Sequence, residues 1–368
     1  MEVLLIGTIV ALIALRARHF KPMGIPALTS LRAFAAAMVF FLHFGDVYYT
    51  GRSNPLSDLM QGGVEGVTIF FVLSGFLLTL STVEAIGQSK FQLRKYVIKR
   101  IARIYPLYYV LLLITTVLAP ATVAWQHFVL AQGFFIRVVT RGIPTAWTLT
   151  VEECFYALLP IILWTCIKIR LSKVIIVVVW CAALAGVGLL LVALHIPEFL
   201  TDPIFMWTHS IFGRFPAFAI GIVCAFAYRN RQEWPLSLLV GSTIAFLITL
   251  HFFVASGEEL APGALDLVCA VCIGGMVLGL TGKNKVCRFL GNRYFVYAGV
   301  ISYALYLVQL TPIMERPANL AGASLVGAIA VYAIASFAAF ILYETIEQPA
   351  RALILRRTKH WQVRQVAV

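Results

Sequence analysis

An arginine and a histidine lie in one otherwise apolar stretch, LTSLRAFAAAMVFFLHF, at residues 28–44. Arg32 and His43 are eleven residues apart, so on a helix both would face the same side, about 16 Å apart along its axis. Ionisable side chains inside a membrane are costly and usually face a bundle interior or a cavity, which makes this pair a candidate site. The alternative is an arginine that reaches the membrane surface and a histidine paired with a neighbouring helix.

A second pair of arginines follows in the stretch KFQLRKYVIKRIARIYPLYY, which begins at Lys90. Arg100 and Arg103 are three residues apart and therefore share a helix face. Because guanidinium groups bind oxyanions through paired hydrogen bonds, the two side chains suit a phosphate or pyrophosphate. The simpler interpretation is that these positive charges only set the orientation of the chain in a membrane.

The two pairs together fit a ligand that has an anionic head and a long arm reaching inward. Acyl-coenzyme A has that shape, with phosphates at one end and a thioester at the end of the arm. His43 would then act as a general base on an incoming hydroxyl, since imidazole transfers protons near neutral pH. It could instead carry the acyl group itself.

Two adjacent carboxylates occur in the stretch GIPTAWTLTVEECFYALLP at residues 142–160. Adjacent residues point in different directions on a helix, so we expect only one of Glu152 and Glu153 to face inward. That carboxylate could activate His43 or bind an acceptor hydroxyl. The alternative is a surface carboxylate paired with Arg137, Arg141 or Arg214.

The composition shows what kind of fold must position these residues. Of the 368 residues, 61% are hydrophobic and 12% are charged, and the mean hydropathy is +0.91. The apolar runs are long and continuous, which predicts an all-α, polytopic transmembrane helical bundle and excludes a β-barrel. Eleven runs are expected to span: 2–15, 29–46, 64–82, 104–119, 147–167, 174–194, 211–228, 236–254, 265–281, 295–314 and 321–345. The segment 124–136 is too short and too polar, and we interpret it as re-entrant or interfacial.

The net charge of +13 is distributed in a pattern typical of membrane proteins rather than of nucleic-acid binding. Of the 29 Lys and Arg residues, 23 fall in alternate loops and in the C-terminal tail. The opposite loops carry acidic residues such as Asp46, Asp58, Glu258 and Glu259. The positive-inside rule therefore predicts a cytoplasmic C-terminus, with the basic tail resting on anionic lipid head groups.

We expect one membrane domain at 28–350, preceded by a hydrophobic segment and basic linker at 1–27 and followed by a basic tail at 351–368. The first segment lacks a small-residue cleavage site and is interpreted as an extra N-terminal helix. The seven cysteines lie in apolar runs or at their basic ends, which argues against a disulfide framework. Cys269 and Cys272 form a C-x-x-C without a partner histidine, so packing is expected rather than a metal site.

Six motifs occur in a fixed order along nearly the whole chain. They are the Arg32–His43 pair, GVTIFFVLSGFLL at 66–78, KRIARIYPLYY at 99–109, WTLTVEECFY at 147–156, SYALYLVQ at 302–309 and YETIEQPARAL at 343–353. In these motifs the chain resembles acyltransferase family 3, a group of integral membrane proteins. Gly66, Ser74 and Gly75 within the second motif are expected to serve helix packing.

The resemblance implies ten core helices and the transfer of an acyl group, most often acetyl, from cytoplasmic acyl-CoA to a hydroxyl. It makes His43 the catalytic histidine, places Arg32, Arg100 and Arg103 near the donor, and favours Glu152 over Glu153. It also implies a bacterial inner (plasma) membrane protein that has acetyl-CoA as a substrate, with neither a metal nor a permanently bound cofactor.

This sequence departs from the family pattern at two positions, and it does not show a further domain that some members carry. The family often has an acidic residue at the position of Thr68 and a histidine at that of Gln309, which argues against a site role for Gln309. A soluble esterase-like domain, present in some members after the last helix, is not seen in this sequence. A separate transferase partner is therefore expected to complete some reactions.

Several functions remain compatible with these residues. The leading hypothesis is O-acetylation of a cell-envelope or secreted glycan, or of a lipid-linked glycan acceptor. A lipid or a macrolide-like small molecule is the alternative acceptor. A transporter or flippase would also place Arg, His and Glu along a membrane path, but inverted repeats and paired broken helices are not apparent.

Overall fold

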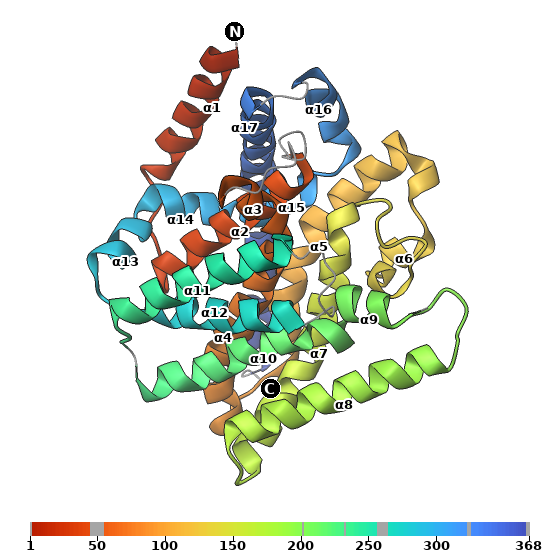
Figure 1. Cartoon of the computed structure of the whole chain (residues 1–368), viewed down its shortest axis with the longest axis vertical. Helices are drawn as coiled ribbons and strands as arrows, with labels where there is room; N and C mark the ends of the chain where they lie inside the picture. The colour runs from red at the N-terminus through yellow and green to blue at the C-terminus, as the bar shows by residue number, and fades with distance from the viewer. Residues whose placement is uncertain are drawn as a thin grey trace.

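The computed structural model describes residues 2–44, 55–200, 202–231, 233–255, 264–321 and 325–365. Within these ranges the chain is helical and forms no β-strand, which confirms the predicted all-α fold (Figure 1). The α-helices are α1 Glu2–Ala17, α2 Pro26–Phe44, α3 Pro55–Gln61, α4 Glu65–Gly87, α5 Leu93–Leu118, α6 Trp125–Phe128, α7 Trp147–Lys168, α8 Lys173–Ala193, α9 Pro203–His209, α10 Ile211–Asn230, α11 Leu236–Ala255, α12 Ala264–Gly279, α13 Lys285–Leu290, α14 Arg293–Val300, α15 Ser302–Val308, α16 Glu315–Ala321, α17 Leu325–Leu342 and α18 Gln348–Gln365.

Seven helical segments are long and apolar enough to cross a membrane, and three shorter apolar helices accompany them in the described part of the chain. The seven are Pro26–Phe44, Asp58–Gly87, Leu93–Leu118, Pro144–Lys168, Lys173–Ala193, Pro203–Asn230 and Val326–Arg357; the shorter three are Ile6–Ala17, Leu236–Phe252 and Ala264–Gly279. Together they match ten of the eleven predicted runs. The chain is thus a multi-pass membrane protein.

The remaining predicted run, 295–314, differs from the expected single helix. It forms α14 and α15 with a turn at Ile301 between them. α14 packs closely on α2, since a side chain added at Gly299 would collide with the carbonyl oxygen of Thr29. After the turn, the Tyr303 hydroxyl donates a hydrogen bond to the Ile104 carbonyl on α5, 2.9 Å away. The turn at Ile301 therefore lets α14 pack on α2, and it directs Tyr303 toward α5 at the centre of the bundle.

Helix α4 forms the centre of the bundle. The span Asp58–Gly87 is 78% buried, whereas α8, along the lower edge in Figure 1, is only 22% buried. Gly66 lies against the Ala35 carbonyl of α2, and Gly75 and Gly221 sit at the crossing of α4 with α10. A side chain at any of these glycines would collide with backbone, so the small residues permit close helix approach, as the sequence predicted for Gly66 and Gly75.

The first segment forms the expected helix, α1, which docks on the end of α17 and on α14 (Figure 1). Arg16 forms an ion pair with Glu344 at 3.0 Å, and Arg293 donates a hydrogen bond to the Arg18 carbonyl at 2.8 Å. These contacts place the basic linker near the π-helical turn η7 Tyr343–Glu347, which leads into α18.

The segment between α5 and α7 folds as short helical turns against both helices. Besides α6, these are η3 Pro120–Thr122, η4 Gln132–Phe134 and η5 Pro144–Ala146. His127 and Gln132 are fully buried, and the Tyr108 hydroxyl donates to the His127 carbonyl at 2.7 Å. The Gln132 amide donates to the Ala146 carbonyl at 3.0 Å. This packing fixes the start of α7, which carries Glu152.

Candidate functional site

Polar and charged side chains from six elements converge in the middle of the apolar bundle. We name this group the inner cluster. Its members are Arg32 on α2, Ser74 on α4, Arg100 and Arg103 on α5, Glu152 and Tyr156 on α7, Tyr303 on α15 and Glu347 on η7. Four of the five predicted site residues are thus brought together from three helices.

Glu152 is held by two hydroxyl groups. Ser74 donates to one carboxylate oxygen at 3.2 Å, and Tyr156, one helical turn along α7, donates to the other at 2.7 Å. Both hydrogen bonds restrict the side chain to one orientation. Ser74 therefore does more than the helix packing that the sequence predicted for it.

Arg32 and Arg103 supply positive charge beside this carboxylate. Each guanidinium lies within electrostatic reach of Glu152 and Tyr156. Glu347 adds a second carboxylate, which is 6% exposed and interacts with both arginines. One of its oxygens has no hydrogen-bond partner among the described residues. The cluster thus balances charges whose burial singly would be costly.

Arg100 lies between two tyrosine rings. Its guanidinium is 5.7 Å from the ring centre of Tyr96 and 5.5 Å from that of Tyr156, which is the geometry of cation–π contacts. The Tyr96 hydroxyl donates to the Tyr156 carbonyl at 3.0 Å, which ties α5 to α7. The Nε atom of Arg100 is buried and has no partner in the described structure, so a donor remains for a ligand.

Glu153, the neighbouring carboxylate, also lies near a positive charge. It is half-buried and interacts electrostatically with Arg100, and one of its oxygens lacks a partner within the described ranges. The hydrogen-bonded carboxylate in the inner cluster is nevertheless Glu152. Neither carboxylate pairs with Arg137 or Arg214, which bind Glu198 and Asp266. The geometry therefore favours the inward-facing interpretation of Glu152.

Two cavities adjoin the inner cluster. The inner cavity, about 40 Å³, is lined by Arg103, Glu152, Tyr303 and apolar side chains of α4. The second, about 250 Å³, opens on the side that carries the basic loops. Its polar lining consists of Lys90, Lys95, Lys99, Arg100, Gln92, Ser81 and Thr82. Arg100 lines this basic cavity and also contacts Tyr156, so one side chain connects the cavity to the cluster.

His43 lies outside the inner cluster. It is in the last turn of α2, about 16 Å along the helix axis from Arg32. The side chain is exposed and forms no hydrogen bond or ion pair with the described residues. Glu152 contacts Ser74 and Tyr156 rather than His43. The structure therefore shows the predicted carboxylate bonded within the inner cluster, while the predicted base lies three helical turns along α2 from Arg32.

Several residues of the site were not singled out from the sequence. Tyr156 and Tyr303 belong to quoted motifs but gave no periodic or charge signal of their own. Glu347 enters the sequence analysis only as part of the last motif. The three lysines of the basic cavity enter it only as loop charges that predict the orientation in the membrane. A polar residue within an apolar run is the signal that would have marked Tyr156 and Glu347.

Comparison with known proteins places the chain in a family. Residues 25–344 match the acyltransferase domain family, and the chain belongs to it. The O-acetyltransferase OatA of Staphylococcus aureus is 23% identical over 320 residues, which covers 79% of this chain and 51% of that protein. An uncharacterized protein of Haemophilus influenzae is 24% identical over 245 residues, which covers 59% of this chain and 99% of the relative.

The chain spans about half the length of the staphylococcal relatives it matches. No solved structure matches the chain. The family assignment therefore rests on sequence, and it supports the expectation drawn from the six motifs. It identifies a membrane-embedded acyltransferase domain, which α1 precedes.

Proposed function

We propose that this chain is a membrane O-acyltransferase that moves an acetyl or other short acyl group from acyl-CoA to a hydroxyl of a cell-envelope or secreted glycan. The observation that carries the proposal is the position of Arg100, which joins the basic cavity to the cluster around Glu152. A donor with phosphates at one end and a thioester at the other requires a basic cavity for the phosphates that connects to the interior of the bundle, where the thioester arm would lie.

The basic cavity is the proposed site of the donor head. Lys90, Lys95, Lys99 and Arg100 offer ammonium and guanidinium donors to phosphates, and Phe91 and Tyr96 offer apolar surface. Beyond Arg100, the arm of the donor would pass Tyr156 toward Arg103 and Arg32. This assigns the predicted donor-binding role to Arg32, Arg100 and Arg103 together.

His43 is the proposed catalytic residue, at the far end of that path. In direct transfer, the hydroxyl oxygen attacks the thioester carbonyl, His43 takes the hydroxyl proton, and the carbon–sulfur bond breaks to release the CoA thiolate. In the covalent route, the His43 nitrogen attacks the thioester carbonyl, the carbon–sulfur bond breaks, and the CoA thiolate leaves with the imidazole proton as the thiol. The hydroxyl oxygen then attacks the acyl-imidazole, the carbon–nitrogen bond breaks, and the hydroxyl proton returns to His43. Either route leaves Glu152 to organise the arginines and the arm, since it lies beside Arg32.

The orientation and the partners follow from the same proposal. The basic loops and the C-terminus lie in the cytoplasm of a bacterial cell, where acyl-CoA is available, and the acceptor is offered on the opposite side. A separate transferase could pass the acyl group to its final acceptor. A lipid or a macrolide-like molecule is the alternative acceptor, and a flippase is the alternative class.

The test uses membrane vesicles that contain the protein, with labelled acetyl-CoA and a broad extract of envelope glycans and lipids. We expect label in an alkali-labile ester, which is lost in His43→Ala. His195→Ala, which removes an exposed histidine in a loop, is the matched control. Labelling unchanged by His43→Ala would remove His43 from the mechanism. Substrate movement that is indifferent to acetyl-CoA would favour the flippase.

A further inference from the structure

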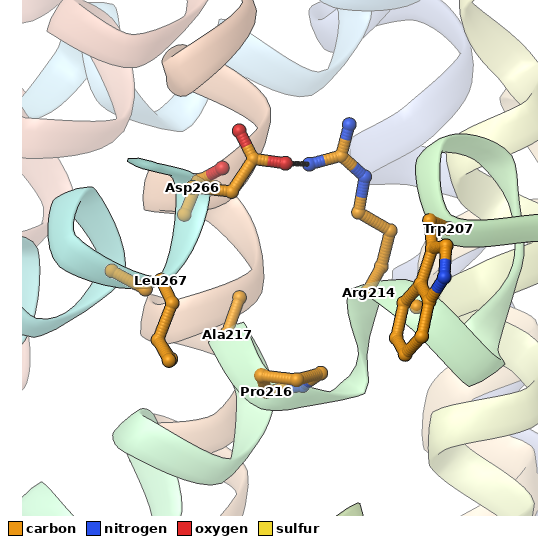
Figure 2. A pocket seen from close by; sticks show the side chains of 9 residues that line it. Trp207, Arg214, Pro216, Ala217, Asp266 and Leu267 are labelled. Atoms are coloured by element: carbon orange, nitrogen blue, oxygen red, sulfur yellow. Dashed lines mark hydrogen bonds and ion pairs between the residues drawn. The ribbon is translucent and has the colours of Figure 1, made fainter. Parts of the chain in front are cut away.

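A third cavity lies away from the inner cluster, where α4, α10 and α12 begin. It has a volume of about 240 Å³, and we name it the outer pocket. Its polar lining comes from Thr68 on α4, Trp207 on α9, Arg214 on α10 and Asp266 on α12. Figure 2 shows Arg214 reaching toward Asp266, with Trp207 on the same side as Arg214, Leu267 on the side of Asp266, and Pro216 and Ala217 below. The proposed function makes no use of these side chains.

Arg214 is held in place by protein groups but keeps donors free for a ligand. Its Nη1 atom lies 2.7 Å from an oxygen of Asp266, and its Nε atom donates to the Thr208 carbonyl at 2.7 Å. The side chain is only 10% exposed. Gly213 allows this arrangement because any side chain there would collide with the Trp207 backbone. A guanidinium has five N–H groups, and these two hydrogen bonds use two of them.

A second carboxylate lies beside the ion pair. Glu65 is 1% exposed, and its carboxyl group lies within hydrogen-bonding reach of Asp266 and Thr68 and interacts with Arg214. Glu65 does not itself line the outer pocket, so the carboxylate oxygens that a ligand can reach there are those of Asp266. A ligand that brings O–H or N–H donors would satisfy them.

The charges of the outer pocket select a neutral ligand. Arg214 and Asp266 both line the pocket and neutralise each other, so neither a cation nor an anion such as the phosphates of the donor meets an unpaired opposite charge. A hydroxyl group both donates and accepts, so it can bind a carboxylate oxygen and a guanidinium N–H together. The indole face of Trp207 offers a flat apolar surface for the C–H face of a ring.

We propose that the outer pocket binds one ring of a neutral carbohydrate chain, as the acceptor-binding site of this transferase. This deepens the proposed function and rests on it. The pocket lies on the side opposite the basic loops, where the acceptor is offered. At about 240 Å³ it is smaller than the range of roughly 300–1,000 Å³ typical of drug-sized ligands and suits a single ring.

The ring in the outer pocket is not the ring that receives the acyl group. His43, the proposed catalytic residue, does not line the outer pocket, and Val67, the neighbour of Thr68, lines the separate inner cavity on another side of α4. The outer pocket would therefore anchor one unit of the carbohydrate chain while another unit reacts. This arrangement requires an acceptor longer than a monosaccharide.

The experiment measures binding of the purified protein in nanodiscs to an array of neutral, anionic and cationic oligosaccharides. We expect wild type to bind neutral oligosaccharides, and Asp266→Asn and Trp207→Leu to weaken that binding at least tenfold. Asp266→Asn preserves the shape of the side chain, and unchanged melting temperature excludes misfolding. Arg137→Ala, which breaks an exposed ion pair with Glu198, is the matched control and should bind as wild type does.

Acetyl-CoA turnover by the same preparations separates this proposal from the proposed function. Turnover by wild type combined with neutral-glycan binding unaffected by Asp266→Asn would overturn the acceptor site alone. So would binding confined to charged oligosaccharides, or no binding at all. Glycan binding that depends on Asp266, in a protein that never consumes acetyl-CoA, would overturn the transferase and retain a carbohydrate site.

Discussion

Tyr156 donates a hydrogen bond of 2.7 Å to the Glu152 carboxylate one turn earlier on α7, while its ring lies against the guanidinium of Arg100. One side chain thus orients the carboxylate and an arginine of the proposed donor path. The hydroxyl and the ring can be tested separately, because phenylalanine keeps the ring. This relationship joins α5 and α7 at the inner cluster.

Tyr156→Phe should lower turnover by roughly tenfold to a hundredfold, since a hydrogen bond to a charged group contributes about 1.5–3 kcal/mol. Steady-state transfer of labelled acetyl groups in vesicles measures the effect. Tyr109→Phe is the matched control, because its hydroxyl forms a bond of equal length to the Phe128 carbonyl outside the cluster. Equal rates in both variants would mean that Glu152 needs no donor from Tyr156.

The two adjacent carboxylates should differ in their contribution. Glu152→Gln replaces an acceptor of two hydroxyl hydrogen bonds beside Arg32 and Arg103, whereas Glu153→Gln changes a group without such bonds. We expect turnover to fall at least tenfold more in Glu152→Gln, measured at saturating acetyl-CoA. The reverse order would identify Glu153 as the functional carboxylate.

The sequence predicts the helical bundle and most of its spans because continuous apolar runs indicate membrane helices directly. It also marks Arg32, Arg100, Arg103 and Glu152, since charges within apolar runs are unusual. It does not show that they meet, because contacts such as Ser74 with Glu152 join residues 78 positions apart.

The turn at Ile301 is likewise not predicted from the sequence, because it depends on a contact between distant segments. It follows from packing of α14 against α2, which hydropathy does not encode.

The sequence also does not predict how far His43 lies from Glu152. Both are polar residues within an apolar run, but their separation depends on how α2 and α7 each pack on α4. Asp46, Glu258 and Glu259, which supported the predicted topology, lie outside the described residues.

Arg100→Ala should raise the KM for acetyl-CoA roughly tenfold, because the variant removes a charge-assisted donor from the basic cavity. We expect kcat to fall less than kcat/KM if the residue mainly binds the donor head. Raising the ionic strength should reduce the difference between wild type and variant, since phosphate contacts near the surface are screened.

The control for this measurement is Arg170→Ala. Arg170 is exposed on the side with the basic loops, so the variant changes net charge equally without altering the cavity. An equal rise of KM in both variants would assign the effect to general surface charge. Lys95→Ala and Lys99→Ala should each give a smaller rise than Arg100→Ala, because only Arg100 also contacts Tyr156.

Gln309 tests whether a buried polar group in this bundle serves the site. Its side chain is fully buried, and neither amide atom has a hydrogen-bond partner among the described residues. The sequence departs from the family pattern here, and a role in the reaction was not expected. Gln309→Leu removes the unpaired amide at similar volume, so we expect the free energy of unfolding to rise by about 1–3 kcal/mol.

Thermal unfolding in detergent measures this rise in stability, and acetyl transfer should remain within twofold of wild type. A large loss of transfer, in protein that unfolds no earlier, would show that the Gln309 amide contacts a substrate.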